Sequence, residues 1–292
     1  MSGKSPESSR VNDTSAGAPT KPVAVTSPLL VLGIDPEGGQ NLNHFKKVLS
    51  AHEAVLEADS TRASVRWLKP NLAFFLRHGS AGIGLLEEFV AKFGHRYFIL
   101  LDAKFSEIEN SLRGSLTFAF ETLGVHGVTI NPFLGEGSIR LALETCARAR
   151  GAQGRVHVLC RTSESSSGAL ASLQQNWRTL VSTVAEQARV VASGQASLEN
   201  LGGVVVGAAH RDILLSSELR ASGLSVLAPG LGAQGAAFSI VKECVTQGPR
   251  EILFPMSRGI FAGGANAPTQ SAALLTEALT HFGHLPPFAT LP

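Results

Sequence analysis

Cysteine is scarce in this chain of 292 residues, and the three that occur are not spaced as pairs. Cys146, Cys160 and Cys244 form no CxxC motif, so the sequence excludes a disulfide framework and a zinc finger. This cysteine usage is typical of a reducing compartment, and we expect a cytoplasmic protein. The chain also lacks any apolar run near the roughly 20 residues that a membrane helix needs. We therefore expect no membrane partner.

An excess of charge of one sign is missing as well. The 25 Lys and Arg residues are balanced by 23 Asp and Glu residues, which gives a net charge of +2. No long basic run occurs, and this argues against a dedicated nucleic-acid-binding protein. The histidines form no HExxH motif and no paired spacing, so we expect no metal site. No GxGxxG follows the first apolar run, so a dinucleotide-binding fold has no support.

The length and the hydrophobic content suit one large domain. Hydrophobic residues make up 44% of the chain, enough for a sizeable core. Residues 1–26 are rich in Ser, Thr, Pro, Gly and Ala and have no apolar period, so we predict a disordered tail there. We expect residues 27–292 to form a single domain, because an α/β barrel of about 250 residues is one folding unit.

From residue 28 onward, short apolar runs alternate with longer segments of helical period. The runs are rich in β-branched residues and continuously apolar, which is typical of strands buried on both faces. They cover residues 29–34, 65–68, 97–101, 127–130, 156–160, 203–206, 224–227 and 251–254. Helical periods lie between them, for example at 82–93, 138–150 and 236–247. Eight strand–helix repeats predict a (β/α)8 TIM barrel, with an open doubly wound sheet as the alternative.

Charged side chains follow several of the predicted strands, at the end of the barrel where chemistry is found in this architecture. Asp102 and Lys104 are two residues apart, so a strand would point both to one side. Lys69 ends the neighbouring strand and is expected beside them. Flanking lysines would hold Asp102 ionised, and one lysine could deliver a proton. The alternative is a structural ion-pair network that caps the barrel.

Glycine-rich loops follow the last two predicted strands. Residues 229–235 and 257–259 contain Gly230, Gly232, Gly235 and Gly259, which let backbone N–H groups approach an anion. Gln234 and Arg258 add side-chain donors, and barrels often bind phosphate at these two strand ends. Tight turns with a solvated arginine would be the alternative. The residues alone therefore predict a small phosphorylated substrate and proton or carboxylate chemistry, without naming the substrate.

Several segments, in order along the chain, resemble the orotidine 5'-phosphate decarboxylase family, in its longer bacterial-type branch. They are LGIDP at 32–36, KPNLAFFLRHG at 69–79, LDAKFSEIENS at 101–111, VTINPFL at 128–134, VLCRTS at 158–163, VVGA at 205–208, APGLGAQG at 228–235 and SRGI at 257–260. The resemblance runs from about residue 29 to 263 and covers all eight predicted strands. It implies cofactor-free conversion of a nucleotide substrate to uridine 5'-phosphate, the last step of de novo pyrimidine synthesis.

The same resemblance implies roles for individual residues. Asp35 would hold the ribose hydroxyls, and Lys69 would join the charged network. Asp102 would lie against the substrate carboxylate, while Lys104 would protonate C6 as carbon dioxide leaves. Ser163 would bind the pyrimidine amide edge. The phosphate would be held by Gln234, Gly235 and Arg258.

A homodimer with shared active sites is also implied by the resemblance. Glu107 would act in the catalytic network of a second subunit, and Ile108 and Ser111 would contact the substrate there. An isologous dimer of this kind places the same surface on both subunits.

The chain departs from the family signature Asp-x-Lys-x-x-Asp-Ile-x-x-Thr at several positions. Phe105 stands where the family has Arg, Glu107 replaces the second Asp, and Ser111 replaces Thr. Glu164-Ser165-Ser166 occupies the place of Asn-Pro-Gly in a loop that covers the substrate, and Leu76 replaces an acidic residue. We therefore expect a decarboxylase that is slower than its relatives. A homologue that binds a pyrimidine nucleotide without turnover and a related sugar-phosphate barrel lyase are the alternatives.

Overall fold

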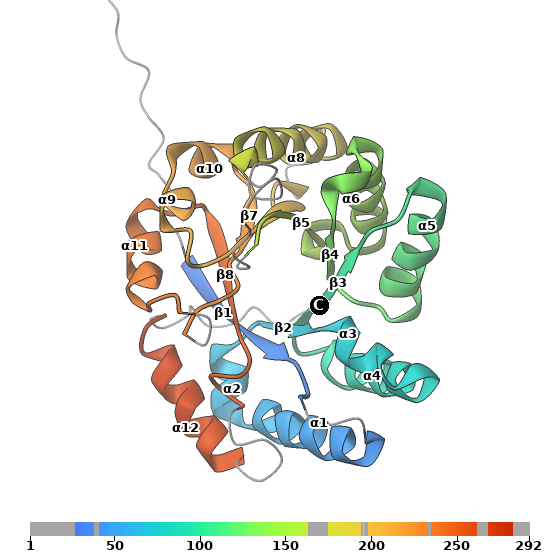
Figure 1. Ribbon diagram of the computed structural model, residues 1–292, viewed down its shortest axis with the longest axis vertical. Coiled ribbons are helices and arrows are strands. Elements are labelled where there is room, and N and C mark those ends of the chain that lie inside the picture. Colours follow the sequence, from blue (N-terminus) through green and yellow to red (C-terminus); the bar gives the residue numbers. More distant parts are fainter. Residues whose placement is uncertain are drawn as a thin grey trace, which may run out of the picture.

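Eight parallel strands close into a barrel, each paired with its neighbours in chain order, and this confirms the predicted TIM barrel (Figure 1). The computed structural model describes residues 27–37, 41–162, 175–193, 195, 198–232, 235–261 and 268–282, and the predicted tail lies outside them. The strands are β1 (Ser27–Ile34), β2 (Trp67–Pro70), β3 (Phe98–Phe105), β4 (Gly127–Ile130), β5 (Arg155–Arg161), β6 (Gly202–Val206), β7 (Ser225–Leu227) and β8 (Glu251–Met256).

Seven of the eight predicted strands differ from the observed bounds, and two of these differences concern the strands that carry the charged site. Val65 ends a short helix that the sequence pattern did not predict, so β2 begins two residues later, at Trp67. The third strand extends four residues beyond the predicted end, to Phe105, and so includes Asp102 and Lys104. Its polar end follows directly on a fully apolar run, which is why hydrophobicity alone placed the end at residue 101.

The helices form an outer layer around the strands (Figure 1). They are α1 (Leu42–Glu57), α2 (Asp59–Ser64), α3 (Leu72–Leu76), α4 (Gly79–Phe93), α5 (Glu109–Thr117), α6 (Glu136–Arg150), α8 (Trp177–Val191), α9 (Arg211–Leu214), α10 (Ser217–Ser222), α11 (Ser239–Gln247) and α12 (Pro268–Leu279). Short turns of helix are η1 (Phe118–Thr122), η2 (Pro132–Leu134) and η3 (Gly151–Gln153). The last helix, α12, packs beside the first, α1, and completes the ring. Within the described residues, no helix is both long and apolar enough to cross a bilayer.

The strands are apolar on both faces because each face is buried in a different core. Alternate residues such as Leu30 and Leu32 pack outward against the helices. The residues between them point into the barrel, where an inner cluster is formed by Val31, Trp67, Leu100, Val205, Leu227 and Leu253. A continuously apolar strand is the result, as the sequence pattern indicated.

Below this inner cluster, polar groups fill the end of the barrel opposite the strand tips. Arg155 and Glu251, which open β5 and β8, are joined by Nε–Oε1 and Nη2–Oε2 contacts of 3.0 and 3.2 Å. His157 is fully buried, with its Nε2 atom 3.1 Å from Oγ of Ser225. We call these four residues the barrel floor. Their mutual contacts satisfy charges that would otherwise be costly to bury.

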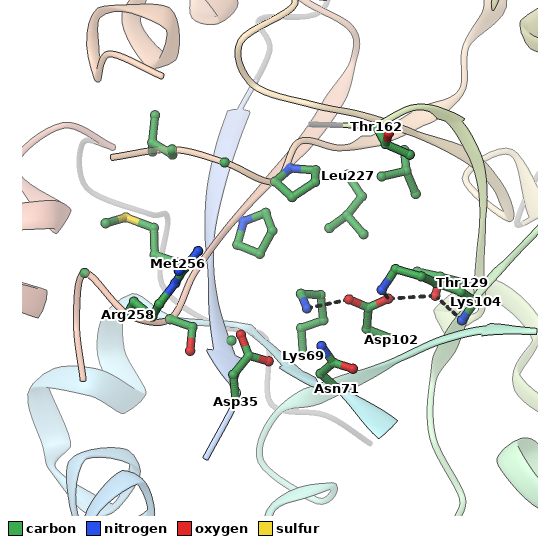
Figure 2. A pocket seen from close by; sticks show the side chains of 18 of the residues that line it. Asp35, Lys69, Asn71, Asp102, Lys104, Thr129, Thr162, Leu227, Met256 and Arg258 are labelled. Carbon is green, nitrogen blue, oxygen red and sulfur yellow. Dashed lines mark hydrogen bonds and ion pairs between the residues drawn. The ribbon is translucent and has the colours of Figure 1, made fainter. Parts of the chain in front are cut away.

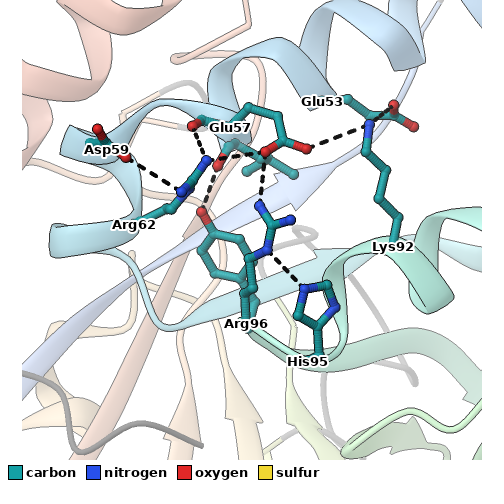
Figure 3. A network of polar contacts seen from close by, with 9 residues as sticks. Glu53, Glu57, Asp59, Arg62, Lys92, His95 and Arg96 are labelled. Atoms are coloured by element: carbon teal, nitrogen blue, oxygen red, sulfur yellow. Dashed lines mark hydrogen bonds and ion pairs between the residues drawn. The ribbon is translucent and has the colours of Figure 1, made fainter.

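An ion-pair network on the outer surface links α1, α2 and α4 to the start of β3 (Figure 3). Glu57 accepts hydrogen bonds from Arg62 and Arg96, at 3.2 and 2.8 Å, while Lys92 contacts Glu53 at 2.9 Å. The buried Tyr97 hydroxyl donates to the carbonyl of Leu56 at 2.7 Å. These contacts fix the helices that surround the first three strands, on which the charged site is built.

Candidate active site

A cavity of about 370 Å³ opens at the carboxyl ends of the strands (Figure 2). A volume in this range suits a small-molecule ligand. Its polar wall is formed by Asp35, Lys69, Asn71, Asp102, Lys104, Thr129, Thr162, Ser257 and Arg258. Its apolar wall includes Leu159, Val205, Leu227, Leu231, Pro255 and Met256. Carboxylate and lysine side chains therefore line the cavity at the ends of β1 to β3, Arg258 lines it after β8, and most of the apolar wall comes from β5 to β8.

Asp102 lies between two lysines in this cavity. Its Oδ2 atom is 2.8 Å from Nζ of Lys69, and its Oδ1 atom is 2.6 Å from Nζ of Lys104. Burial alone would raise the pKa of Asp102, but the two ammonium groups outweigh it and hold that pKa well below its usual range. Asp102 is therefore ionised at neutral pH.

The two lysines differ in exposure. The Lys69 side chain is 8% exposed, and burial would lower its pKa, but Asp102 and Asp35 outweigh this effect and raise it. The Lys104 side chain is 50% exposed and ends at the cavity. The fixed charge of Lys69 is thus part of the wall, whereas the ammonium group of Lys104 is accessible to a bound molecule.

Lys104 does not lie on a regular strand, contrary to the expected pattern of two residues on one face. Leu101 is paired with Val128 and Phe105 with Ile130, so Asp102, Ala103 and Lys104 all stand opposite one residue of β4. Lys104 has a φ of 48°, the one positive value of a non-glycine residue within the described parts of the chain. The bulge, and not simple alternation, brings both side chains into the cavity.

Asp35 lines the cavity with an unsatisfied acceptor. Its Oδ1 atom is buried and receives no hydrogen bond from the described residues. Buried polar atoms are nearly always paired, so an orphaned carboxylate oxygen on a cavity wall indicates a hydroxyl or other donor from a ligand. Asp35 therefore has the geometry to hold the hydroxyl groups of a sugar.

The glycine-rich ends of β7 and β8 also border the cavity, with Arg258 on the side of Asp35, because β8 is paired with β1 (Figure 2). Gly230, Arg258 and Gly259 line the cavity, and Gly230 has a φ of 105°, which strongly favours glycine. Gly235 is not among the lining residues; its N–H donates to the carbonyl of Gly232 at 2.9 Å. Gly235 therefore shapes the turn in the present structure. Gln234, Ser163 and the segment 164–166 lie outside the described residues.

Three residues of the predicted site lie outside the cavity of their own chain. Glu107 and Ile108 are exposed on the segment between β3 and α5, and Ser111 is exposed in the first turn of α5. None of the three lines the cavity. Ile108 is 64% exposed, an unusual environment for a large aliphatic side chain. In a single chain, these side chains do not join Lys69, Asp102 and Lys104.

Thr129 and Asn71 were not singled out from the sequence, although both line the cavity. Asn131, which follows β4, caps η2 by accepting a hydrogen bond from the N–H of Phe133 at 3.0 Å and does not line the cavity. The alternation of side chains along a strand could have identified Thr129. Gly127 is paired with Leu100 and faces the barrel interior, and Thr129, two residues further along β4, faces the same way. Threonine also suits a buried strand, so its type alone carried no signal.

The sequence pattern of the Orotidine 5'-phosphate decarboxylase / HUMPS family matches residues 28–247, three quarters of the chain. The chain belongs to this family. An orotidine 5'-phosphate decarboxylase of Herpetosiphon aurantiacus is 29% identical over 86% of this chain and 94% of that protein. One of Roseiflexus castenholzii is 31% identical over 84% of this chain and 87% of that protein. A structure from Toxoplasma gondii, titled as an orotidine-monophosphate decarboxylase, superposes with a TM-score of 0.70 at 26% identity, covering 86% and 91% of the two chains.

The charged cluster of Lys69, Asp102 and Lys104 lies within the part of the chain that matches the orotidine 5'-phosphate decarboxylase family. Arg258 follows the matched segment but lies on the wall of the same cavity. The structure thus gathers the basic side chain expected at the phosphate and the lysine–aspartate cluster around one space.

Proposed function

We propose that this protein decarboxylates orotidine 5'-phosphate to uridine 5'-phosphate, with Lys104 as the proton donor. The observation that carries the proposal is the cluster of Lys69, Asp102 and Lys104 on the wall of a ligand-sized cavity. The family of the chain and the shared name of its relatives support the same reaction.

The reaction breaks the bond between C6 and the carboxylate carbon and leaves the electron pair on C6. A positive charge near C6 stabilises that pair more strongly in the transition state than in the bound substrate, as catalysis requires. The ammonium group of Lys104 is exposed to the cavity and can then transfer its proton to C6 as carbon dioxide departs. Asp102 keeps Lys104 in place, and the fixed cation of Lys69 keeps Asp102 ionised.

The two other polar parts of the wall suit the rest of the nucleotide. The free Oδ1 acceptor of Asp35 fits a ribose hydroxyl. The guanidinium group of Arg258 can bind phosphate with two hydrogen bonds, aided by the backbone at Gly230 and Gly259. We also assign Gln234 and Gly235 to the phosphate and Ser163 to the pyrimidine amide. Binding energy from the phosphate is available to stabilise the transition state at C6.

A homodimer would complete each site with Glu107 of the second subunit. Large hydrophobic residues are exposed on the segments that follow β2, β3 and β4, namely Leu76 at 54%, Ile108 at 64% and Phe133 at 77%. These strands are neighbours in the barrel, so one side of its mouth carries apolar surface that a second copy could bury. Glu107 and Ser111 lie on the same surface, away from their own cavity.

Subunit mixing tests this arrangement. Lys104→Ala and Glu107→Ala homodimers are both expected to have little activity. Mixed 1:1 and re-associated, they should recover about a quarter of wild-type activity, because half of the dimers then contain one intact site. No recovery in dimers shown to have exchanged subunits would mean that Glu107 does not serve the partner's site.

The activity itself is tested by the ultraviolet loss of orotidine 5'-phosphate on adding the purified protein. Binding of uridine 5'-phosphate, measured alongside, separates an enzyme from a nucleotide-binding homologue. A ketose phosphate supplied with Mg²⁺ tests the sugar-phosphate lyase. The proposal requires loss of orotidine 5'-phosphate with formation of uridine 5'-phosphate; cleavage of the ketose phosphate alone would contradict it.

We further propose a cytoplasmic location. Cys146, Cys160 and Cys244 are free and buried, and burial raises the pKa of each thiol to about 12. Unpaired thiols of this kind are compatible with a reducing compartment. Fractionation of the native cells would test this location.

A further inference from the structure

The hydroxyl group of Thr129 connects the backbone of Lys104 to the carboxylate of Asp102 (Figure 2). The N–H of Lys104 donates to Thr129 Oγ1 at 2.9 Å, and that hydroxyl donates to Asp102 Oδ1 at 2.9 Å. We propose that Thr129 is a positioning residue for the reaction: it holds Lys104 in its strained conformation and aims the ammonium group at C6. This inference rests on the proposed function, because it assigns Thr129 to the proton transfer that Lys104 performs.

The backbone of Lys104 needs such support. A φ of 48° is costly for a residue with a Cβ atom, by roughly one to two orders of magnitude in population, and persists only where the surroundings enforce it. Three residues of β3 stand opposite Thr129 alone, so the regular ladder between β3 and β4 is interrupted there. The side chain of Thr129 replaces the missing backbone acceptor for the N–H of Lys104.

The direction of the hydroxyl proton follows from these contacts. The N–H of Lys104 can only donate, so Thr129 Oγ1 must accept from it and has one proton left to give. Asp102 is ionised and can only accept, so this proton goes to Oδ1. The same Oδ1 atom accepts from Nζ of Lys104 at 2.6 Å. Lys104 is therefore held at its backbone and its ammonium group by one three-residue ring.

Burial makes the arrangement sensitive to replacement. Thr129 is 1% exposed, so water cannot easily take the place of its hydroxyl group. Thr129→Val keeps the shape but removes both hydrogen bonds. The N–H of Lys104 would then be unpaired next to a strained backbone, and a shift of its ammonium group by about 1 Å would cost on the order of 100-fold in rate.

Steady-state kinetics with orotidine 5'-phosphate tests the inference on the wild type and four variants. We expect Thr129→Val and Thr129→Ala to lower kcat about 10- to 100-fold, with a change in KM of about threefold or less. Thr129→Ser, which matches the alanine variant in size but keeps the hydroxyl group, should recover most of the wild-type kcat. Thr145→Val removes a buried threonine hydroxyl from α6 at a position that does not line the cavity, and should leave kcat unchanged.

The outcomes separate this inference from the proposed function. Equal kcat values for the serine and alanine variants, or a kcat of Thr129→Val within twofold of wild type, would overturn the role of Thr129 while leaving the decarboxylase intact. If wild type itself had no activity, the proposed function would fail. Crystal structures of wild type and Thr129→Val would then still test whether Thr129 positions Lys104. The inference requires that the Lys104–Asp102 contact is lost in the variant. An unchanged contact would contradict it.

Discussion

Lys69 and Asp102 form an ion pair of 2.8 Å between Nζ and Oδ2, with side chains only 8% and 12% exposed. Two charges so far from water are stable only as partners, and the pKa shifts reflect this: that of Lys69 is raised and that of Asp102 is lowered. The pair closes the charged side of the cavity and supports Lys104, which reaches the same carboxylate. Its disruption has consequences for stability as well as for catalysis.

We predict that Asp102→Asn destabilises the protein by about 3 kcal/mol at pH 7, because the two lysines then lose the carboxylate that lies between them. Folding lowers the pKa of Asp102, so the ionised carboxylate stabilises the folded state. This stabilisation is fully present at a pH above the ordinary pKa of an aspartate, and it is lost as the pH falls through the lower pKa of the folded protein. Urea denaturation measures the change. Asp59→Asn is the control: Asp59 is 97% exposed and pairs with Arg62 at the surface, so it should cost less than about 1 kcal/mol. Equal effects for the two variants would contradict the prediction.

Shortening Glu107 should raise the decarboxylation rate. Glu107 stands where the family signature has Asp, and sites of this kind lose rate when a group is displaced by about 0.5 Å. Glu107→Asp restores the family's chain length, and kcat for orotidine 5'-phosphate is expected to increase severalfold. The control, Glu109→Asp, shortens an exposed neighbour that pairs with Arg113 and should not change kcat. An unchanged or lower rate for Glu107→Asp would show that the longer side chain is not a handicap.

The buried histidine of the barrel floor should make stability depend on pH. Burial lowers the pKa of His157 to about 4 from an ordinary 6.5, so between these values the unfolded chain binds a proton that the folded chain does not. The free energy of unfolding therefore falls as pH decreases from 6.5 to 4, by about 3 kcal/mol for this residue. His157→Gln should reduce the difference in unfolding free energy between pH 7 and pH 5. His44→Gln, at an exposed position of α1, should leave that difference as in wild type. If the unfolding free energy of both variants depended on pH in the same way, His157 would not be the source of the pH dependence.

Gly203 leaves room for that histidine. A Cβ atom at Gly203 would lie 2.6 Å from Cδ2 of His157 and 2.8 Å from the carbonyl oxygen of Ser225. Gly203→Ala should therefore destabilise the protein by at least about 1–3 kcal/mol, through overpacking of the barrel floor. Gly84, inside α4, has no atom within 4 Å of an added Cβ, so Gly84→Ala should stabilise by up to about 1 kcal/mol. Thermal unfolding of the two variants should shift in opposite directions, and a shift of the same sign would contradict this.

The sequence predicted the barrel because each apolar run is buried on two faces and the runs recur eight times. Lys69, Asp102 and Lys104 could be placed at one end of the barrel for the same reason, since the carboxyl ends of parallel strands meet there. The bulge in β3 could not be predicted. It depends on the register between β3 and β4 and on the hydroxyl group of Thr129, which no local pattern encodes.

The residues expected from the second subunit illustrate a different limit. Glu107 and Ile108 were assigned to the site from a resemblance, whereas in one chain alone they are exposed and do not line the cavity. In the proposed homodimer, the second chain would bring them to a substrate. Hydrophobic pattern, which predicted the barrel well, says nothing about which surface meets a partner, apart from an excess of exposed apolar residues such as Phe133.

The central claim is that Lys104 delivers the proton to C6, and the turnover of orotidine 5'-phosphate by Lys104→Ala tests it most directly. The Lys104 side chain is half exposed and lies at the surface of the cavity, so its removal should leave the barrel folded. We predict near-complete loss of turnover, with an unchanged circular dichroism spectrum and retained binding of uridine 5'-phosphate. Turnover by the variant at the wild-type rate would contradict the account, because another group would then have to protonate the carbon.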